Sequence, residues 1–261
     1  MQDSMYSAFF GAMSQEARMN IITNNLANAN TTGYRREEVA FEDVFVRYAS
    51  DYADPNRSLE DRILWPESKL RSQTRVSPTH LNFEQGGLKN TGNQLDLAIA
   101  GEGFFEVETP EGEVAYTRNG SFYRDPETGA MITGQRFQLL GEDGPIIIPD
   151  DAANITITQD GQVVADGEVL DVINLTTFEN LNDLEKKGRQ LLRVKEGVDA
   201  QPQPAENARV QQGYLEDSNV EVVYEMVNMI TVMRNFEAMQ KIVTTTHEKD
   251  QQVIRDVGTT R

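Results

Sequence analysis

Residues 24–33 carry the stretch Asn24-Asn25-Leu26-Ala27-Asn28-Ala29-Asn30-Thr31-Thr32-Gly33. Asparagine side chains bond to nearby backbone groups, and asparagine and glycine both tolerate the left-handed backbone conformation. Four asparagines and a glycine in so short a stretch therefore favour a shaped turn over continued helix. We expect this stretch to end a helix that precedes it.

The residues before this turn have helical spacing. Asp3 or Ser4 can cap the start of a helix. An apolar stripe follows at intervals of threes and fours, interrupted by Glu16 and Thr23. Its members are Met5, Phe9, Ala12, Met19 and Leu26, and a second stripe beside it holds Phe10, Met13 and Ala17. The sequence predicts an N-terminal helix and turn over residues 1–34.

The C-terminal segment has the clearest periodicity in the chain. Glu216, Asp217 and Ser218 offer caps and acidic charge for a helix start. Apolar residues then recur at fours and threes, with Gln240 as a polar exception. They are Val222, Met226, Met229, Met233, Phe236 and Val243, beside a second stripe of Val223, Val227 and Ile230. We expect a long helix within residues 206–261, paired with the N-terminal helix on one stripe and with other chains on the second.

Between the ends, short β-type runs alternate with turn dipeptides. Asp143-Gly144, Asp160-Gly161 and Asp166-Gly167 suit tight hairpins, and Asn119-Gly120 is expected to join residues 114–117 to 121–123. This pattern predicts a central antiparallel β domain over residues 81–205, with a return linker at 201–204. Residues 35–80 are polar and aperiodic, which indicates an extended connector. The predicted fold is α+β, with long terminal helices pairing as a coiled-coil-like layer around the β-rich centre.

Composition excludes several classes of function. The 261 residues include no cysteine, which removes disulfides, thiolate metal sites and cysteine nucleophiles. A net charge of −18 argues against binding to nucleic acid or to anionic membranes. No apolar run is long enough to span a bilayer, and the N-terminus lacks the features of a cleaved signal peptide. Residues 41–212 carry −14 of the charge, so the predicted helical ends are nearly neutral.

The sequence offers no convincing catalytic, cofactor or metal site. Gly101-Glu102-Gly103 is followed by Phe104-Phe105, which open a strand rather than the helix that a phosphate-binding loop requires. His80 and His247 show no metal-ligand spacing. We therefore expect no enzyme activity, cofactor or metal.

Several motifs resemble those of one protein family. Residues 24–35 resemble the signature of bacterial flagellar axial proteins, the rod and hook subunits. Residues 85–99, 101–107 and 116–122 are similar to the entry of that family's β domain and its first hairpin. Residues 212–220 and 225–230 resemble the beginning of its C-terminal helix. The resemblance covers nearly the whole chain in the family's order.

The resemblance implies a structural subunit of the flagellar basal-body rod, which polymerises helically and transmits motor torque to the hook. It implies copies of the same chain and other rod and hook proteins as partners, and uncleaved export by the flagellar type III apparatus into a rod that spans the periplasm. A distal-rod or hook-type subunit is the alternative within the family. The sequence Met233-Arg234-Asn235-Phe236-Glu237 departs from the distal-rod pattern and favours the minor proximal-side subunit.

Two groups of residues are the predicted functional sites. The subunit interface is expected at Phe9, Met13, Ile22, Met226, Met229, Met233 and Phe236. The turn that orients the N-terminal helix is expected at Asn24, Asn25, Leu26, Ala27, Asn28, Thr32 and Gly33. For the interface residues, packing within one subunit's helix pair is the competing interpretation, and for the turn residues it is a local turn whose hydrogen bonds are satisfied within itself.

Two other classes of protein are alternatives to the rod subunit. A carbohydrate-binding or polysaccharide-active β protein would use aromatic platforms, for which the candidates are Trp65, Tyr116, Phe122 and Tyr123. That class does not account for the terminal helices. A free-standing coiled-coil adaptor would not need the β-rich centre.

Overall fold

The computed structural model describes residues 2–39, 41–47, 70–76, 80–152, 154–188 and 190–258. The chain divides into two compact units. One unit comprises residues 1–23, 38–80 and 226–261, and the other comprises residues 24–37 and 81–225. The first holds nearly all of the two terminal helices, and the second is built of strands. The fold is therefore α+β with a β-rich centre, as the sequence predicted.

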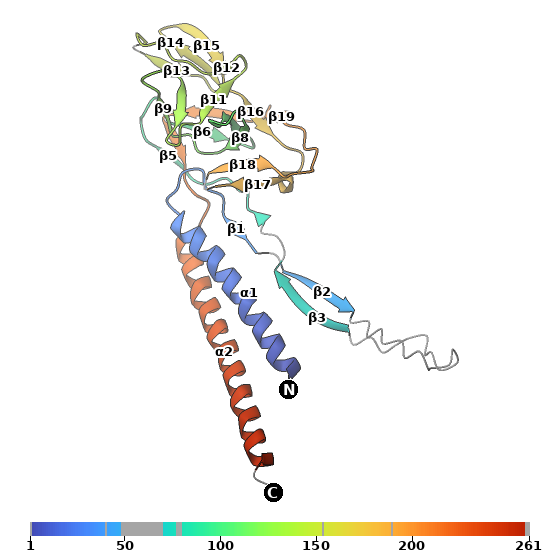
Figure 1. The fold of residues 1–261 in the computed structure, drawn as a ribbon. Coiled ribbons are helices and arrows are strands. Elements are labelled where there is room, and N and C mark those ends of the chain that lie inside the picture. Colours follow the sequence, from blue (N-terminus) through green and yellow to red (C-terminus); the bar gives the residue numbers. More distant parts are fainter. Residues whose placement is uncertain are drawn as a thin grey trace, which may run out of the picture. The chain divides into compact units, whose positions relative to one another are not determined.

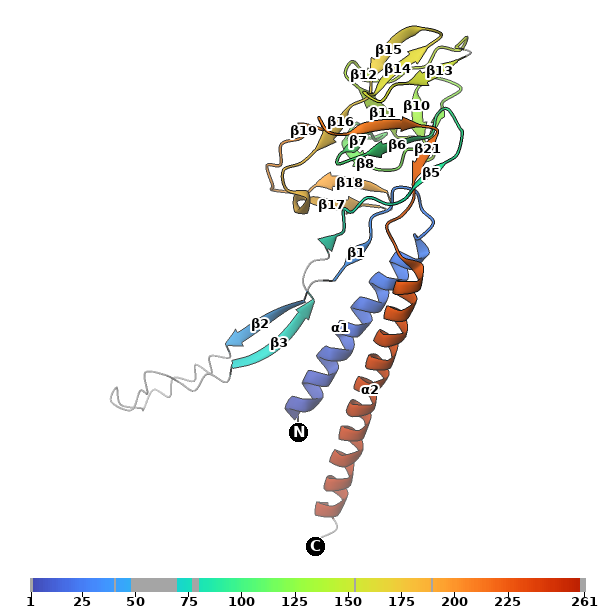
Figure 2. The ribbon, with the colours of Figure 1, turned by 180° about the vertical axis from the view of Figure 1, so that it is seen from behind.

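The first unit contains two long helices. Helix α1 spans Gln2–Ala27 and helix α2 spans Val222–Gly258. They lie side by side and run in opposite directions, as both views show (Figures 1 and 2). The unit also contains strands β2 (Phe41–Arg47) and β3 (Leu70–Val76), which pair antiparallel along their full length. The predicted connector thus contains a pair of strands that its aperiodic sequence did not indicate.

Helix α1 ends where the sequence predicted, because the asparagine-rich turn begins directly after Ala27. The expected start of α2 near Glu216–Ser218 is wrong, because the helix begins at Val222. Strand β21 (Tyr214–Glu216) instead pairs with strand β5 (Leu88–Asn90). The polar residues that suggested a helix cap occupy the end of that strand and the turn after it.

The second unit is built from short strands. Its first strands are β1 (Glu37–Glu38), which pairs with β4 (His80–Leu81), then β5, β6 (Leu97–Ala100), β7 (Phe104–Glu108), β8 (Val114–Thr117) and β9 (Phe122–Arg124). They are followed by β10 (Met131–Thr133), β11 (Gln138–Gly141), β12 (Gly144–Pro145), β13 (Ile155–Ile157), β14 (Gln162–Ala165) and β15 (Glu168–Val172). The last are β16 (Leu175–Thr177), the 3-10 helix η2 (Leu181–Asp183), β17 (Leu184–Lys187), β18 (Leu191–Val194), β19 (Gln203–Pro204), β20 (Arg209–Gln212) and β21.

The strands form one large sheet and several small ones. The large sheet follows the order β17-β18-β8-β7-β11-β10-β9, with β12, β16 and β19 attached to it. Strands β13, β14 and β15 form a three-stranded antiparallel meander. Strand β20 returns from the C-terminal side of the unit to pair with β6, and β21 does the same with β5. The β unit therefore needs residues beyond the predicted boundary at 205.

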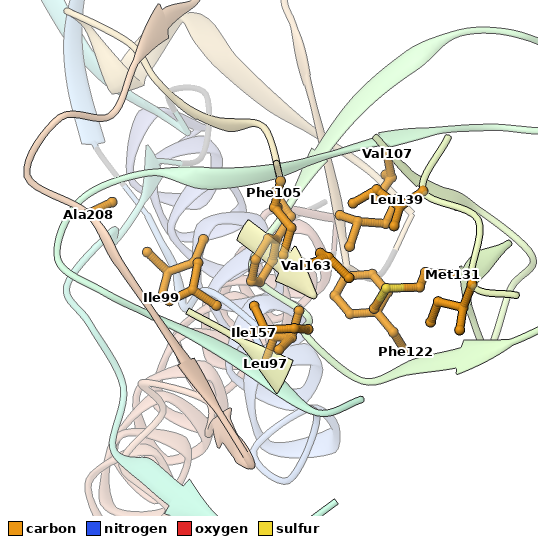
Figure 3. Close-up of a cluster of buried hydrophobic side chains, with 14 of the residues drawn as sticks. Leu97, Ile99, Phe105, Val107, Phe122, Met131, Leu139, Ile157, Val163 and Ala208 are labelled. Carbon is orange, nitrogen blue, oxygen red and sulfur yellow. The ribbon is translucent and has the colours of Figure 1, made fainter. Parts of the chain in front are cut away.

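A hydrophobic core fills the β unit (Figure 3). Residues from β6, β7, β9, β10, β11, β13, β14 and β20 meet there. The residues with the least exposed surface include Phe105, Phe122, Met131, Leu139 and Val163. Phe105 and Phe122 contact edge to face, with ring centroids 5.5 Å apart.

Most of the predicted turns are confirmed, and one is not. Asp166 and Gly167 both have positive φ and join β14 to β15, as an Asp-Gly hairpin turn should. Gly101-Glu102-Gly103 leads into strand β7, as predicted. The hairpin expected at Asn119-Gly120 is wrong, because β8 pairs with β7 and β18 while β9 pairs with β10. Gly120 is needed for a different reason: a Cβ there would lie 1.6 Å from the Leu97 carbonyl oxygen.

The pairing of β20 and β21 gives the first prediction. A fragment of residues 24–221, which keeps Arg35 beside Glu216, should fold with its β unit intact, and one of residues 24–201 should not. The shorter fragment lacks Ala208 and Val210 of the core and leaves β5 and β6 without their partners. Circular dichroism and thermal melting of the two fragments test this. A cooperative transition of equal midpoint in both would show that β20 and β21 are dispensable.

Candidate assembly site

The side of α1 that packs against α2 holds several small and polar residues, with Ile22 as a large apolar member. Ala8, Ser14 and Ile22 are buried, and they recur with Gly11 at helical spacing. A Cβ on Gly11 would lie 3.4 Å from the Met239 sulfur, so the two helices approach closely there. Small residues permit this approach, and they leave little apolar surface of α1 in the contact.

On the side of α2 that faces α1, buried and half-buried residues recur at intervals of three and four. Val232 is buried on it, and Asn228, Phe236, Met239 and Val243 are half-buried. Among the side chains described on α2, it is the one aliphatic residue that is buried. Val232 was not predicted from the sequence, because it belongs to neither of the two apolar stripes.

The large apolar side chains of both helices point the other way. On α1, Phe9 and Met13 are about half exposed at 53% and 51%, and Phe10 lies beside them at 38%. On α2, the exposed apolar residues include Met226, Val227, Ile230 and Met233. With a helical step of about 100° per residue, these residues point away from Ile22 and Val232, except that Met233 lies to one side, about 100° from Val232. We call these seven residues, which lie on the outer side of each helix, the outward apolar face.

The structure divides the seven predicted interface residues into two groups. Phe9, Met13, Met226 and Met233 belong to the outward apolar face. Ile22 is buried, and Met229 and Phe236 are half-buried, on the sides that the two helices turn toward each other. For these last three, the competing interpretation of packing within one subunit accounts for their burial.

The predicted turn after α1 is held by side-chain hydrogen bonds. The Tyr34 hydroxyl lies 2.9 Å from Asn24 Oδ1 and 3.1 Å from Asn25 Oδ1. The buried Asn25 amide donates to the Glu37 carbonyl oxygen and accepts from the Glu37 N–H, which reproduces one rung of a β ladder. Asn28 closes the helix end by donating to the Asn24 carbonyl oxygen. Asn24, Asn25 and Asn28, three of the seven predicted turn residues, thus take part in the hydrogen bonds that hold the turn.

The remaining turn residues contribute less. Leu26 is half-buried and Ala27 is exposed. The Thr32 hydroxyl donates to Asn119 Oδ1 over 3.1 Å, which links the turn to the loop after β8.

Gly33 allows the turn to contact the β unit directly. Its φ is +67°, and a Cβ there would lie 2.4 Å from the backbone of Arg118 and Asn119. The Gly33 N–H donates to the Glu216 carbonyl oxygen over 2.8 Å. Only glycine both adopts this positive φ readily and avoids the collision that a Cβ would make at this position.

A buried carboxylate lies beneath this contact. Glu216 has no exposed surface, and its two oxygens lie 2.7 Å from Arg35 Nη1 and 3.2 Å from Arg118 Nη1. The Gly86 N–H also donates to it. Arg118 further donates to the carbonyl oxygens of Ile99 and Gly101. We call residues 24–37 together with Arg118, Lys186 and Glu216 the joint.

Lys186 contacts the turn from strand β17. Its ammonium lies 2.6 Å from a Glu37 carboxylate oxygen and 3.8 Å from the centre of the Tyr34 ring. Burial, followed by the charge of Glu37, raises the pKa of Tyr34 well above its ordinary value. Burial lowers the pKa of Lys186, and Glu37 opposes that effect.

The sequence analysis missed the charged residues of the joint. Arg118 lies within a stretch that resembled the family, but its partner is 98 residues away. Glu216 was interpreted as a helix cap. A buried ion pair between distant segments leaves no periodic signal in a sequence.

Comparison with known protein families places the chain. The model described as flagella basal body rod protein matches residues 5–35. The flagellar hook protein FlgE/F/G D1 domain matches residues 98–165, and the flagellar basal body rod FlgEFG protein C-terminal domain matches residues 211–256. The matches thus cover α1 and its turn, part of the β unit, and β21 with α2.

Whole-chain relatives agree with these matches. The flagellar basal-body rod protein FlgG of Buchnera aphidicola subsp. Acyrthosiphon pisum is 37% identical over 94% of this chain and 96% of its own. FlgG of Bacillus subtilis is 32% identical over 96% of this chain and 97% of its own. FlgF of Caulobacter vibrioides is 33% identical over 99% of each chain. The chain belongs to the flagellar basal-body rod and hook protein family.

Two features of the described residues bear on other functions. None of the described helices combines the length and the apolar composition that a membrane crossing requires. Within the same part of the chain, no three His, Cys, Asp or Glu residues are grouped as a metal site would need.

Gly33 provides the second prediction. Gly33→Ala should lower the free energy of unfolding by about 2–5 kcal/mol, because it adds backbone strain and a collision with residues 118–119. Gly92→Ala is the matched control, because its φ is +72° but nothing lies within 4 Å of the added carbon. It should cost only about 1–2 kcal/mol. Urea denaturation of the full chain measures both, and equal losses would refute the close approach.

Tyr34 provides the third prediction, in alkaline solution. Because folding raises the pKa of Tyr34, its contribution to stability is complete below the unfolded value of 10.0 and is lost as pH rises above it. The free energy of unfolding should therefore decline as the pH rises above about 10. Tyr34→Phe should start lower, because it loses the bonds to Asn24 and Asn25, and should decline less. Burial also raises the pKa of Tyr116, so part of the decline should remain.

Tyr123→Phe is the control for this experiment, because it removes an exposed phenol. Its decline should match that of the unmodified chain. Parallel declines in the unmodified chain and Tyr34→Phe would show that Tyr34 does not titrate in this range.

Proposed function

We propose that this chain, a structural subunit of the bacterial flagellar basal-body rod, assembles with its neighbours through the outward apolar face of α1 and α2. The observation that carries the proposal is the orientation of the two helices. Small and polar residues make up much of the contact between them, while large apolar side chains stay exposed on the outer side of each helix: Phe9, Phe10 and Met13 on α1 and Met226, Val227, Ile230 and Met233 on α2. Exposed apolar side chains that are grouped on a helix are typical of surfaces that become buried against a partner.

The spacing of residues along α1 and α2 supports a more detailed arrangement of the helices. The inner sides of α1 and α2 repeat at threes and fours, which is the seam of a coiled-coil-like pair. A second seam on the opposite side lets each pair pack between copies of itself and other rod or hook proteins. Repetition of one head-to-tail contact then generates a helical tube.

The distribution of charge supports the same surface. The helical ends are nearly neutral, while residues 41–212 carry −14. Helices of low net charge can pack against copies of themselves with little repulsion. The partners are therefore neighbouring subunits of the axial structure, and the location is the basal body. The flagellar type III export apparatus is the proposed route to it.

A non-enzymatic role fits this family, and the choice of subunit is part of the proposal. The departure at residues 233–237 supports the minor proximal-side subunit over the distal-rod subunit. Cross-linking in purified basal bodies, followed by identification of the linked neighbours, tests that choice. Linkage to hook subunits would overturn it.

The carbohydrate-binding alternative loses two of its four aromatic candidates. Tyr116 and Phe122 are buried within the β unit, where no sugar can stack on them. Tyr123 is exposed, and Trp65 lies outside the described residues. No observation now favours this alternative over the rod subunit.

Incorporation into the rod is the fourth prediction. Met226→Asp/Met233→Asp should reduce the amount of the subunit in purified basal bodies at least tenfold, because two charges cannot be buried in an apolar seam. The β unit should remain folded, since both residues lie on the exposed side of α2. Immunoblotting and electron microscopy of basal bodies, with swimming motility as a second readout, measure the effect.

Two variants serve as controls. Met226→Leu/Met233→Leu keeps the face apolar and should incorporate normally. Gln240→Asp/Gln251→Asp adds the same charge at exposed polar positions of α2 and should also incorporate. Normal incorporation of the first double aspartate variant would refute the outward apolar face as a subunit seam. Intact rods in cells that lack the protein would refute the function itself.

A further inference from the structure

A small cavity lies inside the joint. It is lined by Arg35, Arg118, Lys186 and Gln190, together with Gly33 and two leucines at the start of strand β18. Its space for the centre of a water-sized sphere is about 10 Å³, so it admits one particle of about that size. All of these residues belong to the β unit.

The lining is positively charged. Three cationic side chains and no carboxylate line the cavity. Glu216 pairs with both arginines and Glu37 pairs with Lys186, so two carboxylates face three cations. Glu102 acts on Arg118 from an exposed position, where water screens its charge. The three cations and the two carboxylates that pair with them therefore carry a net charge of +1.

The guanidinium groups also hold unused donors. Arg35 is only 3% exposed, and its Nε, Nη1 and Nη2 have no hydrogen-bond acceptor among the described residues. Its contact with Glu216 is an ion pair without the alignment of a hydrogen bond. The Nε of Arg118 likewise lacks an acceptor in the described part of the chain. Buried charged donors without acceptors are costly, so a ligand that accepts from them is strongly favoured.

We propose that this cavity is a binding site for a small monovalent anion of the halide class, such as chloride. A halide is only slightly larger than a water molecule, accepts from several donors at once and supplies the missing negative charge. Phosphate and sulfate are too large for the space. A water molecule fits the space but leaves the charge uncompensated.

The anion also has a structural consequence. Arg35 belongs to the turn after α1, Arg118 follows β8 and Lys186 belongs to β17, so one ion joins three segments that are distant in the sequence. Burial and the neighbouring charge of Arg35 lower the pKa of Arg118 to about 10, against the effect of Glu216. A bound anion relieves that repulsion and holds the turn against the β unit.

Thermal melting of the full chain tests the site, with sodium chloride, sodium bromide and sodium gluconate compared at equal ionic strength. Saturating chloride or bromide should raise the melting temperature by about 2–4 °C over gluconate, because a ligand of the folded state alone stabilises it. The rise should saturate with concentration. Equal melting temperatures in all three salts would overturn the proposal.

Variants of two adjacent lysines locate the effect. Lys186→Gln removes a cation from the cavity and should abolish the halide-dependent rise. Lys187→Gln removes a cation that pairs with Glu113 outside the cavity, and should keep the rise. An equal rise in both variants would overturn the proposed location.

Crystals of the full chain soaked in sodium bromide provide a test that does not depend on a variant. An anomalous bromine peak between Arg35 and Arg118 supports the site. A crystal without that peak, with a water molecule in its place, overturns it.

Discussion

The turn after α1 is attached to the rest of the β unit through the ion pairs and hydrogen bonds of the buried Glu216 carboxylate. This carboxylate has no exposed surface, and it binds Arg35 from the turn, Arg118 from the end of β8 and the backbone N–H of Gly86. A buried carboxylate is tolerated only when its partners are all in place. Its pairing therefore fixes three segments at once, and the Gly33 N–H adds a fourth contact through the Glu216 backbone. Segments that are far apart in the sequence are in this way bound to one another through Glu216.

The helices show a complementary constraint. A helix with one neighbour buries one stripe, and α1 and α2 use small or polar residues such as Gly11, Ser14 and Asn228 for it. Hydrophobic burial within the pair is accordingly modest, because the effect scales with the apolar area removed from water. The outward apolar face leaves further apolar side chains exposed, and burial of these side chains by a neighbouring subunit would add to the stability of the pair.

Local features of the fold could be predicted from the sequence, and long-range ones could not. The end of α1, the Asp166-Gly167 hairpin and the strand after Gly103 depend on residues that are neighbours in the chain. The pairing of β20 with β6 joins residues more than a hundred positions apart, and their short runs fit several partners equally well. The start of α2 was misplaced for the same reason, because Glu216 is a good helix cap in isolation. Only its buried arginine partners show why that residue ends a strand instead.

The charge of the chain acts differently at long and short range. The excess of acidic residues gives −18 overall, yet Arg35, Arg118 and Lys186 gather in one buried place. At physiological ionic strength the Debye length is about 8 Å, so the exposed carboxylates have little influence inside the joint. The three cations that line the cavity have a strong influence there, because burial reduces the screening between them. An acidic protein can therefore contain a site that selects anions, provided that the site is small and closed. In this chain the site lies at the turn that connects an assembling helix to the β unit.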